Sequence, residues 1–359
     1  MYMCCSMKKN ETRKRIEYFD LMKGVCIALV VISHCYEELE IRLSNEHLWS
    51  MLEHLRMPLY FFLSGMFFKE YSCFIDFVVR KFNKLIIPLL FFCVITVIPK
   101  LLIGQVDFDF IAVKKHISWM LKYGGYLWFL RTLFFANILY YTYNHFVKDR
   151  GIYTRIGVML ALTLSGWIIN SFIPIEGDFR SDYAYIISII TSFLVLPFFF
   201  VASWMRKILG SGEIRIGKTA LALIFILSLS VSYLTSSGGV YLVNAKVENN
   251  IILFYIAAFS SILSVWCVCY TVKKLFYFSY IGRYSIIVYL THIPLLNVLV
   301  YKGWCTDVYV LAAVTLAFMP VMIWIFKAVF PAFVAQRDIL LYQDGRLKVD
   351  WKAFSLKNR

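Results

Sequence analysis

The chain has 359 residues, of which 60% are hydrophobic, 18% aromatic and only 16% charged. Soluble domains rarely exceed about 50% apolar residues, so this composition excludes an ordinary soluble protein. The net charge of +15 is compatible with nucleic-acid binding. However, the basic residues lie between apolar segments, which is the distribution that membrane topology produces. The sequence therefore predicts an integral membrane protein with the lipid bilayer, and no nucleic acid, as its partner.

Apolar runs long enough to cross a bilayer recur along the whole chain. They predict an all-α polytopic bundle of about ten transmembrane helices. These helices are expected at residues 20–38, 50–68, 84–103, 126–146, 154–173, 184–205, 217–235, 250–271, 281–300 and 307–330. Residues 1–19 are then a basic N-terminal segment, residues 20–330 are one transmembrane domain, and residues 331–359 are a tail that forms an interfacial helix or a loose end.

The distribution of lysine and arginine predicts the orientation of the bundle. If the N-terminus is cytoplasmic, the inner segments hold roughly 26 basic residues against 10 in the outer segments. This bias favours two cytoplasmic termini and an even number of helices. The nine cysteines are scattered and show no metal-ligand spacing, so we expect neither a disulfide framework nor a metal site.

The first apolar run is bracketed by two ionisable residues, Lys23 and His34. Eleven residues return a helix to within about 20° of its starting direction, so both side chains share one face, about 16 Å apart along the axis. An ionisable group at the depth of His34 costs about 2–3 kcal/mol or more if it faces lipid, so it should face protein or a wet cavity. It is either a structural histidine bonded to a neighbouring helix or a functional one.

Glu37 follows His34 by three residues and lies on the same helical face. It is either an ordinary solvated residue at the helix end or a partner that fixes one tautomer of the imidazole and raises its basicity. The next apolar run opens with His54 and Arg56, and Arg56 either anchors in the lipid headgroups or has a functional role.

Three further groups of ionisable residues lie in or beside apolar runs. Arg80, Lys81 and Lys84 stand at the predicted inner end of the third helix, where they follow the topology rule or form a phosphate cradle. Arg131 lies within an aromatic run, and His292 lies in the ninth helix, where a lone histidine is more often structural than catalytic.

Taken together, these stretches resemble the membrane-bound acyltransferase-3 family, which includes O-acetyltransferases of bacterial surface polysaccharides. The resemblance rests on five segments in family order: RIEYFDLMKGVCIALVVISH, RMPLYFFLSGMFF, RKFNKLIIPLL, LWFLRTLFF and IGRYSIIVYLTHIPL. The family pattern of a basic residue, ten residues and a histidine is matched by Lys23 and His34. The resemblance implies that residues 20–330 are an acyltransferase-like domain and that His34 is essential for acyl transfer.

Two positions depart from the family pattern. The family often has an Arg-x-x-Arg pair in the third helix, and this chain has Lys81-x-x-Lys84 instead. Lysine does not bind phosphate in the bidentate manner of arginine, so the expectation of bidentate binding is weakened. The frequent histidine before Met-Pro is Arg56 here, so that role is unassigned although His54 is close.

The resemblance further implies an acyl-CoA donor, for which we expect acetyl-CoA, in the cytoplasm of a bacterium. It also implies a glycan or lipid-linked saccharide acceptor beyond the inner membrane. Lys23, Arg80, Lys81 and Lys84 would meet the donor phosphates, while Arg56, His54, Arg131 and His292 would stabilise the oxyanion or hold the acceptor. His34, supported by Glu37, would act as a general base or as a nucleophile that forms an acyl-imidazole.

Two other classes of function also fit these residues. Intramembrane His, Lys and Arg serve proton and anion paths in secondary transporters. The chain shows neither the internal repeat nor the paired broken helices that many carriers have. The remaining class is an accessory protein of lipid or glycan synthesis that performs no chemistry.

Overall fold

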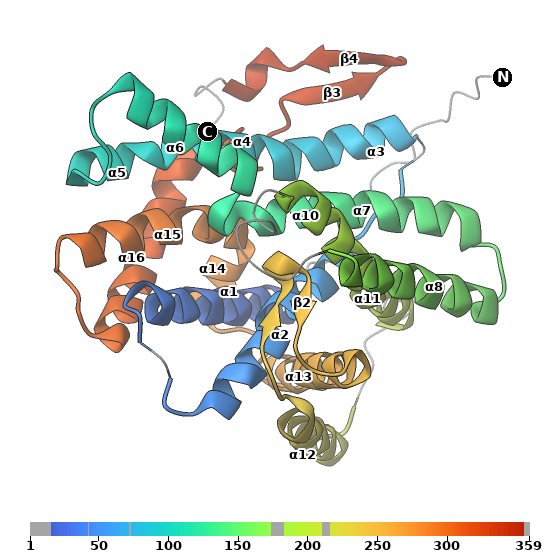
Figure 1. Ribbon diagram of the computed structural model, residues 1–359. Coiled ribbons are helices and arrows are strands. Elements are labelled where there is room, and N and C mark those ends of the chain that lie inside the picture. The colour runs from blue at the N-terminus through green and yellow to red at the C-terminus, as the bar shows by residue number, and fades with distance from the viewer. Residues whose placement is uncertain (1–15, 42, 72, 174–182, 210–215, 355–359) are drawn as a thin grey trace.

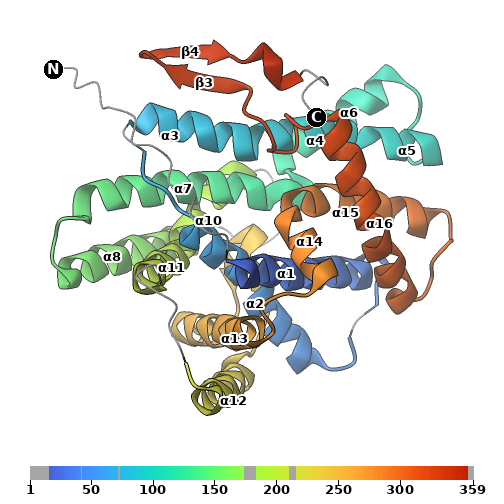
Figure 2. The same ribbon diagram turned by 180° about the vertical axis from the view of Figure 1, so that it is seen from behind.

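The computed structural model describes residues 16–41, 43–71, 73–173, 183–209 and 216–354, which form a bundle of helices with two short hairpins (Figures 1 and 2). The helices are α1 (Glu17–Glu38), α2 (Glu46–Met66), α3 (Phe74–Lys81), α4 (Ile87–Ile95), α5 (Val97–Ile103), α6 (Phe110–Tyr123), α7 (Trp128–Val147), α8 (Ile152–Ser171), α10 (Ala184–Leu194), α11 (Leu196–Leu209), α12 (Lys218–Thr235), α13 (Ile251–Val272), α14 (Phe276–Arg283), α15 (Ser285–Tyr301) and α16 (Val308–Val329). The hairpins are β1 (Val240–Tyr241) with β2 (Lys246–Val247), and β3 (Leu340–Gln343) with β4 (Arg346–Val349).

The prediction of an all-α polytopic membrane protein is confirmed. Within the described residues, six helical segments are long and apolar enough to cross a bilayer, and two bent pairs raise this number to eight. The helices predicted at 50–68 and 126–146 also form, as α2 and α7, but they do not reach the same hydropathy. Their polar and charged side chains, such as Glu53, His54 and Arg131, lower that hydropathy.

Two predicted spans are bent rather than straight. The helices α10 and α11 meet at 41°, and α14 and α15 meet at 91°. The third span runs over 30 residues from Phe74 to Ile103, so it begins ten residues before the predicted start at 84. It contains the π-helical turn η1 (Phe82–Ile86), a local form that recurs at functional sites in proteins.

Helix α1 lies in the centre of the bundle, with α2, α13, α14, α15 and α16 packed against it (Figure 1). The contact with α14 is close because both helices present glycine. A methyl group on Gly24 would overlap the backbone of Phe278, and one on Gly282 would overlap the backbone of Asp20. Lys23 is therefore next in the chain to Gly24, a residue at which α1 and α14 approach closely through their backbones.

The C-terminal tail forms an ordered hairpin against α3, where the sequence suggested an interfacial helix or a loose end (Figure 1). The buried side chain of Asn83 explains this docking. Its Oδ1 accepts hydrogen bonds from the backbone nitrogens of Ile339 and Leu340, each at 2.9 Å, and its Nδ2 donates to the Leu340 carbonyl at 2.7 Å. These bonds satisfy backbone groups that a loose tail would leave to water.

The opposite end of the bundle carries the β1–β2 hairpin, which the sequence did not predict. Ser50 Oγ donates to the Gly238 carbonyl at 2.8 Å, and Glu53 Oε2 accepts from the Val240 nitrogen at 3.0 Å. The hairpin is therefore fixed to the first half of α2. The amphipathic helix α6 was also not predicted from the sequence. It follows the third span, and the side chain of Asp109 caps its first turn.

Candidate active site

A cavity of about 830 Å³ opens at the end of α1, the start of α2 and the β1–β2 hairpin. Its position follows from the two fixed ends of the hairpin, which hold residues 238–248 over the first turns of α2. We call it the outer pocket because the distribution of basic residues predicts that this end faces away from the cytoplasm. It is lined by Val30, His34, Tyr36, Glu37, Glu40, Ile41, Leu43, Glu46, Trp49, Ser50, Glu53, Arg56, Met57, Trp128, residues 238–243 and Glu248.

His34 lies in the wall of this pocket with its side chain 25% exposed. Its Nδ1 contacts Glu37 Oε2 at 2.8 Å. A carboxylate only accepts hydrogen bonds, so in the neutral imidazole the proton sits on Nδ1 and the lone pair on Nε2. The pair predicted from the i, i+3 spacing therefore forms, and it gives one imidazole nitrogen the form that a base or nucleophile requires.

Arg56 lies on the other side of the same carboxylate. Its guanidinium is 3.4 Å from Glu37 Oε1 and lies over the Trp49 ring at 5.6 Å. Its backbone carbonyl accepts a hydrogen bond from Cys26 Sγ at 2.9 Å, which ties this turn of α2 to α1. Glu37 is therefore held between an imidazole and a guanidinium, both in the wall of the outer pocket.

His292 lies behind His34, although the two are 258 positions apart in the chain. The ring centroids are 5.2 Å apart at 40°, and His292 is fully buried. Its Nδ1 donates to the Val288 carbonyl at 3.0 Å, and its Nε2 has no partner among the described residues. The structure thus brings together a histidine pair from α1 and α15 whose members the sequence identified separately.

A second, smaller cavity of about 250 Å³ lies toward the opposite end of the same helices. We call it the inner pocket. Lys23, Lys81 and Lys84 all line it, together with apolar and aromatic side chains. The third helix and the start of the first helix, which the sequence analysis linked to donor binding, are therefore next to each other in space.

The three lysines of the inner pocket have different surroundings. Lys23 Nζ lies over the Phe67 ring at 4.0 Å, and Lys81 Nζ lies over the Phe77 ring at 5.5 Å. Lys84 Nζ is 3.0 Å from Asp338 Oδ1 and also donates to the Ala335 carbonyl at 2.7 Å. The C-terminal segment therefore holds one of the three cations.

Arg80 has a different position from its neighbours. Its Nε bonds both oxygens of Asp76, at 2.9 and 3.0 Å, and its guanidinium lies over the Tyr71 ring at 4.9 Å. It is absent from the described lining of both pockets. Lys81 at the end of α3 and Lys84 in η1 point into the inner pocket, whereas Arg80 of α3 points away from it.

Arg131 and His54 also lie outside both pocket linings. The Arg131 guanidinium is buried, with Nε bonded to Ser188 Oγ at 2.8 Å and its face over the Tyr185 ring at 4.5 Å. His54 is fully buried, and its Nδ1 donates to the Ser50 carbonyl at 2.8 Å. These contacts account for Arg131, whereas the Nε2 atom of the buried His54 has no hydrogen-bond partner within the described residues.

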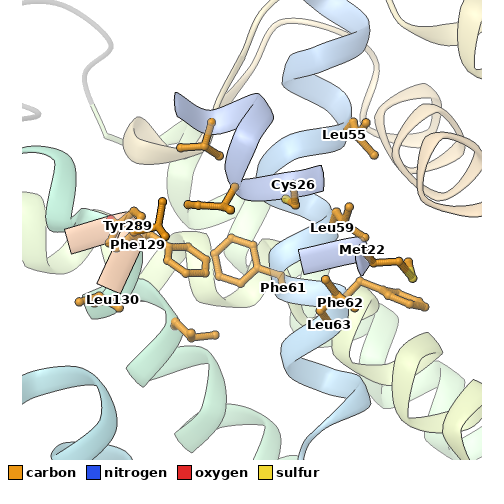
Figure 3. Packing of buried hydrophobic residues seen from close by; sticks show 14 of the residues in the cluster. Met22, Cys26, Leu55, Leu59, Phe61, Phe62, Leu63, Phe129, Leu130 and Tyr289 are labelled. Atoms are coloured by element: carbon orange, nitrogen blue, oxygen red, sulfur yellow. The ribbon is translucent and has the colours of Figure 1, made fainter. Parts of the chain in front are cut away.

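A packed layer separates the two pockets, which share no lining residue. Figure 3 shows part of this layer, where the Phe129 ring makes edge-on contacts with the rings of Phe61 and Tyr289. The layer is thin on α2, where Met57 of the outer pocket and Tyr60 of the inner pocket are three residues apart. This spacing corresponds to about 4.5 Å along the helix axis.

Several lining residues of the outer pocket were not predicted from the sequence. Glu53 lies one turn before Arg56 on the helix and could have been found from that spacing. The β1–β2 hairpin gave only the Gly238-Gly239 turn signal, which predicts a loop but not what the loop covers. Asp338, the partner of Lys84, lies 254 positions beyond it and carries no local signal.

No group of three or more His, Cys, Asp or Glu side chains suited to a metal ion occurs within the described ranges. The family model described as an acyltransferase domain, Acyl_transf_3, matches residues 16–331. No curated protein and no solved structure matches the chain significantly. The matched residues contain all the elements that line the two pockets, and Asp338, which pairs with Lys84, lies beyond them.

Proposed function

The chain belongs to the acyltransferase-3 family of membrane acyltransferases, and from this premise we propose that it transfers an acyl group, most simply acetyl, from cytoplasmic acyl-CoA to a hydroxyl of an extracytoplasmic glycan or glycolipid. The bilayer would be the inner membrane of a bacterium. The observation that carries the proposal is the contact of His34 with Glu37 in the wall of the outer pocket.

In this proposal the inner pocket binds the donor. Lys23, Lys81 and Lys84 offer positive charge to the phosphates, and the apolar walls suit the pantetheine arm. The axial distance of about 16 Å between Lys23 and His34 matches the length over which that arm must extend. The donor would cross the thin layer between Met57 and Tyr60, so that layer must open when the donor binds.

The chemistry at His34 is that of a general base. Its Nε2 takes the proton from the acceptor hydroxyl as the oxygen attacks the thioester carbonyl. The new C–O bond forms, the C–S bond breaks, and coenzyme A leaves as a thiolate that takes up a proton. Glu37 stabilises the imidazolium, and Arg56 holds Glu37 in place.

The alternative chemistry uses His34 Nε2 as a nucleophile. It would form an acyl-imidazole with release of coenzyme A, and the acceptor hydroxyl would then take the acyl group. His292 is close enough to interact with His34 in either case, but its own contacts are to the backbone of α15. We assign it a supporting place behind His34.

Incubation of the purified protein in lipid nanodiscs with radiolabelled acetyl-CoA and membrane glycan tests the proposal. We expect label on the glycan, and a single burst of label on the protein if the acyl-imidazole forms. A transporter or an accessory protein would leave the glycan unlabelled, and that result would refute the proposed function.

A further inference from the structure

The outer pocket is lined by many more acidic than basic side chains. Its described lining holds one guanidinium, that of Arg56, and five carboxylates: Glu37, Glu40, Glu46, Glu53 and Glu248. The inner pocket shows the reverse, because three lysines and no carboxylate occur in its described lining. The two cavities therefore have opposite electrostatic character although they share the same helices.

The one guanidinium of the outer pocket is already paired. Arg56 is bonded to Glu37, whose other oxygen contacts His34. Glu248 is paired with Lys246 at 2.9 Å. The contact with Glu37 leaves the Arg56 side chain with little capacity to neutralise an incoming anion. A guanidinium that already faces one carboxylate attracts a second anion more weakly.

The other three carboxylates form no salt bridge within the described residues, although the charge of Arg56 acts on Glu53. Glu53 accepts hydrogen bonds from Trp49 Nε1 at 2.9 Å and from the Val240 nitrogen at 3.0 Å, and it is almost fully buried. Glu40 and Glu46 are exposed at the pocket edge and make no ion pair within the described chain. They add negative potential to a cavity with low-dielectric walls, which strengthens the field inside it.

The backbone of the β1–β2 hairpin favours the ionised form of Glu248. The Gly239 nitrogen donates to Glu248 Oε2 at 2.9 Å, and together with the Lys246 ammonium it lowers the pKa of Glu248. Trp49, Trp128 and Tyr241 add flat aromatic faces to the same cavity. Such side chains offer apolar area together with a polar edge, which suits the face of a sugar ring.

Resting on the proposed function, we infer that the acceptor segment in the outer pocket is an uncharged saccharide, and that the pocket excludes sugars with a carboxylate or phosphate near the reacting hydroxyl. Placing like charges together at an interface costs several kcal/mol, enough to decide between acceptors of equal shape. Glu40, Glu46 and Glu248 are the specificity-determining residues, and His34 is the catalytic one.

A matched acceptor pair tests the substrate class. Octyl glucuronide and its methyl ester carry the same hydroxyls and differ in the charge of the carboxyl group, and we expect at least tenfold more label on the ester from radiolabelled acetyl-CoA. Equal labelling, or more label on the glucuronide, would overturn the inference. Label on neither would count against the proposed function, and the next measurement then decides the inference by itself.

The charge of the pocket can be measured without turnover. Val243 lines the pocket and is 41% exposed, whereas Leu234, at the end of α12, is 78% exposed and lies outside the described lining. The variants Val243→Cys and Leu234→Cys would be reacted in nanodiscs with methanethiosulfonates bearing a trimethylammonium or a sulfonate group, with the parent protein as background. We expect the cation-to-anion rate ratio to be about tenfold higher at position 243.

Substitutions of the edge carboxylates sharpen this measurement. Adding Glu40→Gln and Glu46→Gln to the Val243→Cys protein should lower the rate ratio toward that of Leu234→Cys, because both changes remove charge and keep the side-chain shape. A ratio at position 243 equal to or below that at position 234 would overturn the inference. Neither reagent requires acyl transfer, so failure here and failure of the proposed function are distinguishable.

Discussion

The outer and inner pockets share helices α1, α2 and α7 but differ in size and in the charge of their linings. The outer pocket is about 830 Å³ and is closed over by a hairpin, while the inner pocket is about 250 Å³ and lies between helix faces. Carboxylates dominate the first and lysines the second. Under the proposed function, the carboxylates of the outer pocket would repel the anionic phosphates of the donor, and the lysines of the inner pocket would attract them.

The layer between the pockets shows where the two regions depend on each other. Phe129 and Tyr289 belong to the inner lining, and Trp128 belongs to the outer lining next to Phe129 in the chain. Helices α1, α2 and α7 thus contribute to both cavities within one or two turns. Substitutions that affect a single pocket should consequently separate the chemical step from donor binding.

The largest effect is expected for His34→Ala. Loss of a general base typically lowers the rate by a factor of about 100–10,000, so kcat for acyl transfer should fall by that factor while the KM for acetyl-CoA stays within about twofold. Steady-state transfer of radiolabel measures both constants. Thermal unfolding in detergent serves as the control, and full activity in this variant would remove His34 from the mechanism.

The inner pocket should show the reverse pattern. In the double variant Lys81→Met/Lys84→Met, the loss of two hydrogen bonds to charged phosphates, each worth about 1.5–3 kcal/mol, should raise the KM for acetyl-CoA about 100-fold or more, with a smaller change in kcat. Lys218→Met, at the same end of the bundle and outside the described pocket linings, is the matched control. An unchanged KM in the double variant would place the donor elsewhere.

A smaller effect is expected for Glu37→Gln. The amide can still contact His34 Nδ1, but hydrogen bonds with an ionised partner are roughly twice as strong as neutral ones. We expect kcat to fall about tenfold, with acetyl-CoA binding unaffected. Glu38→Gln, on the neighbouring position of the same helix, provides the comparison, and an equal loss in both variants would argue against a specific role for Glu37.

The smallest effect on catalysis is expected for Asn83→Ala. This change removes the side chain that bonds Ile339 and Leu340, and each unsatisfied buried group costs about 1–3 kcal/mol. The hairpin should detach from α3, while acyl transfer falls less than the inner-pocket lysine variants do. Limited proteolysis near the Asp344-Gly345 turn measures the detachment, and an uncleaved tail would show that other contacts hold it.

Local patterns were sufficient for the helices and for part of the site. Apolar length predicted the spans, and the i, i+3 spacing of His34 and Glu37 predicted a contact that forms at 2.8 Å. The same reasoning could not predict that Lys81 lines the inner pocket while Arg80 does not. Adjacent positions on a helix face different neighbours, and those neighbours decide which side chain reaches a pocket. Arg131 and His54 show the same limit, since their buried partners lie on other turns and helices.

The sequence by itself determined the membrane-spanning class, the approximate helix positions and the acyltransferase family, because hydrophobic length and ordered motifs are properties of contiguous residues. Tertiary structure alone decided that His292 lies behind His34, that residues 238–248 cover the outer pocket and that Asp338 holds Lys84. These pairings join distant parts of the chain through packing, glycine contacts and loop closure, and no local pattern encodes which distant segments will meet.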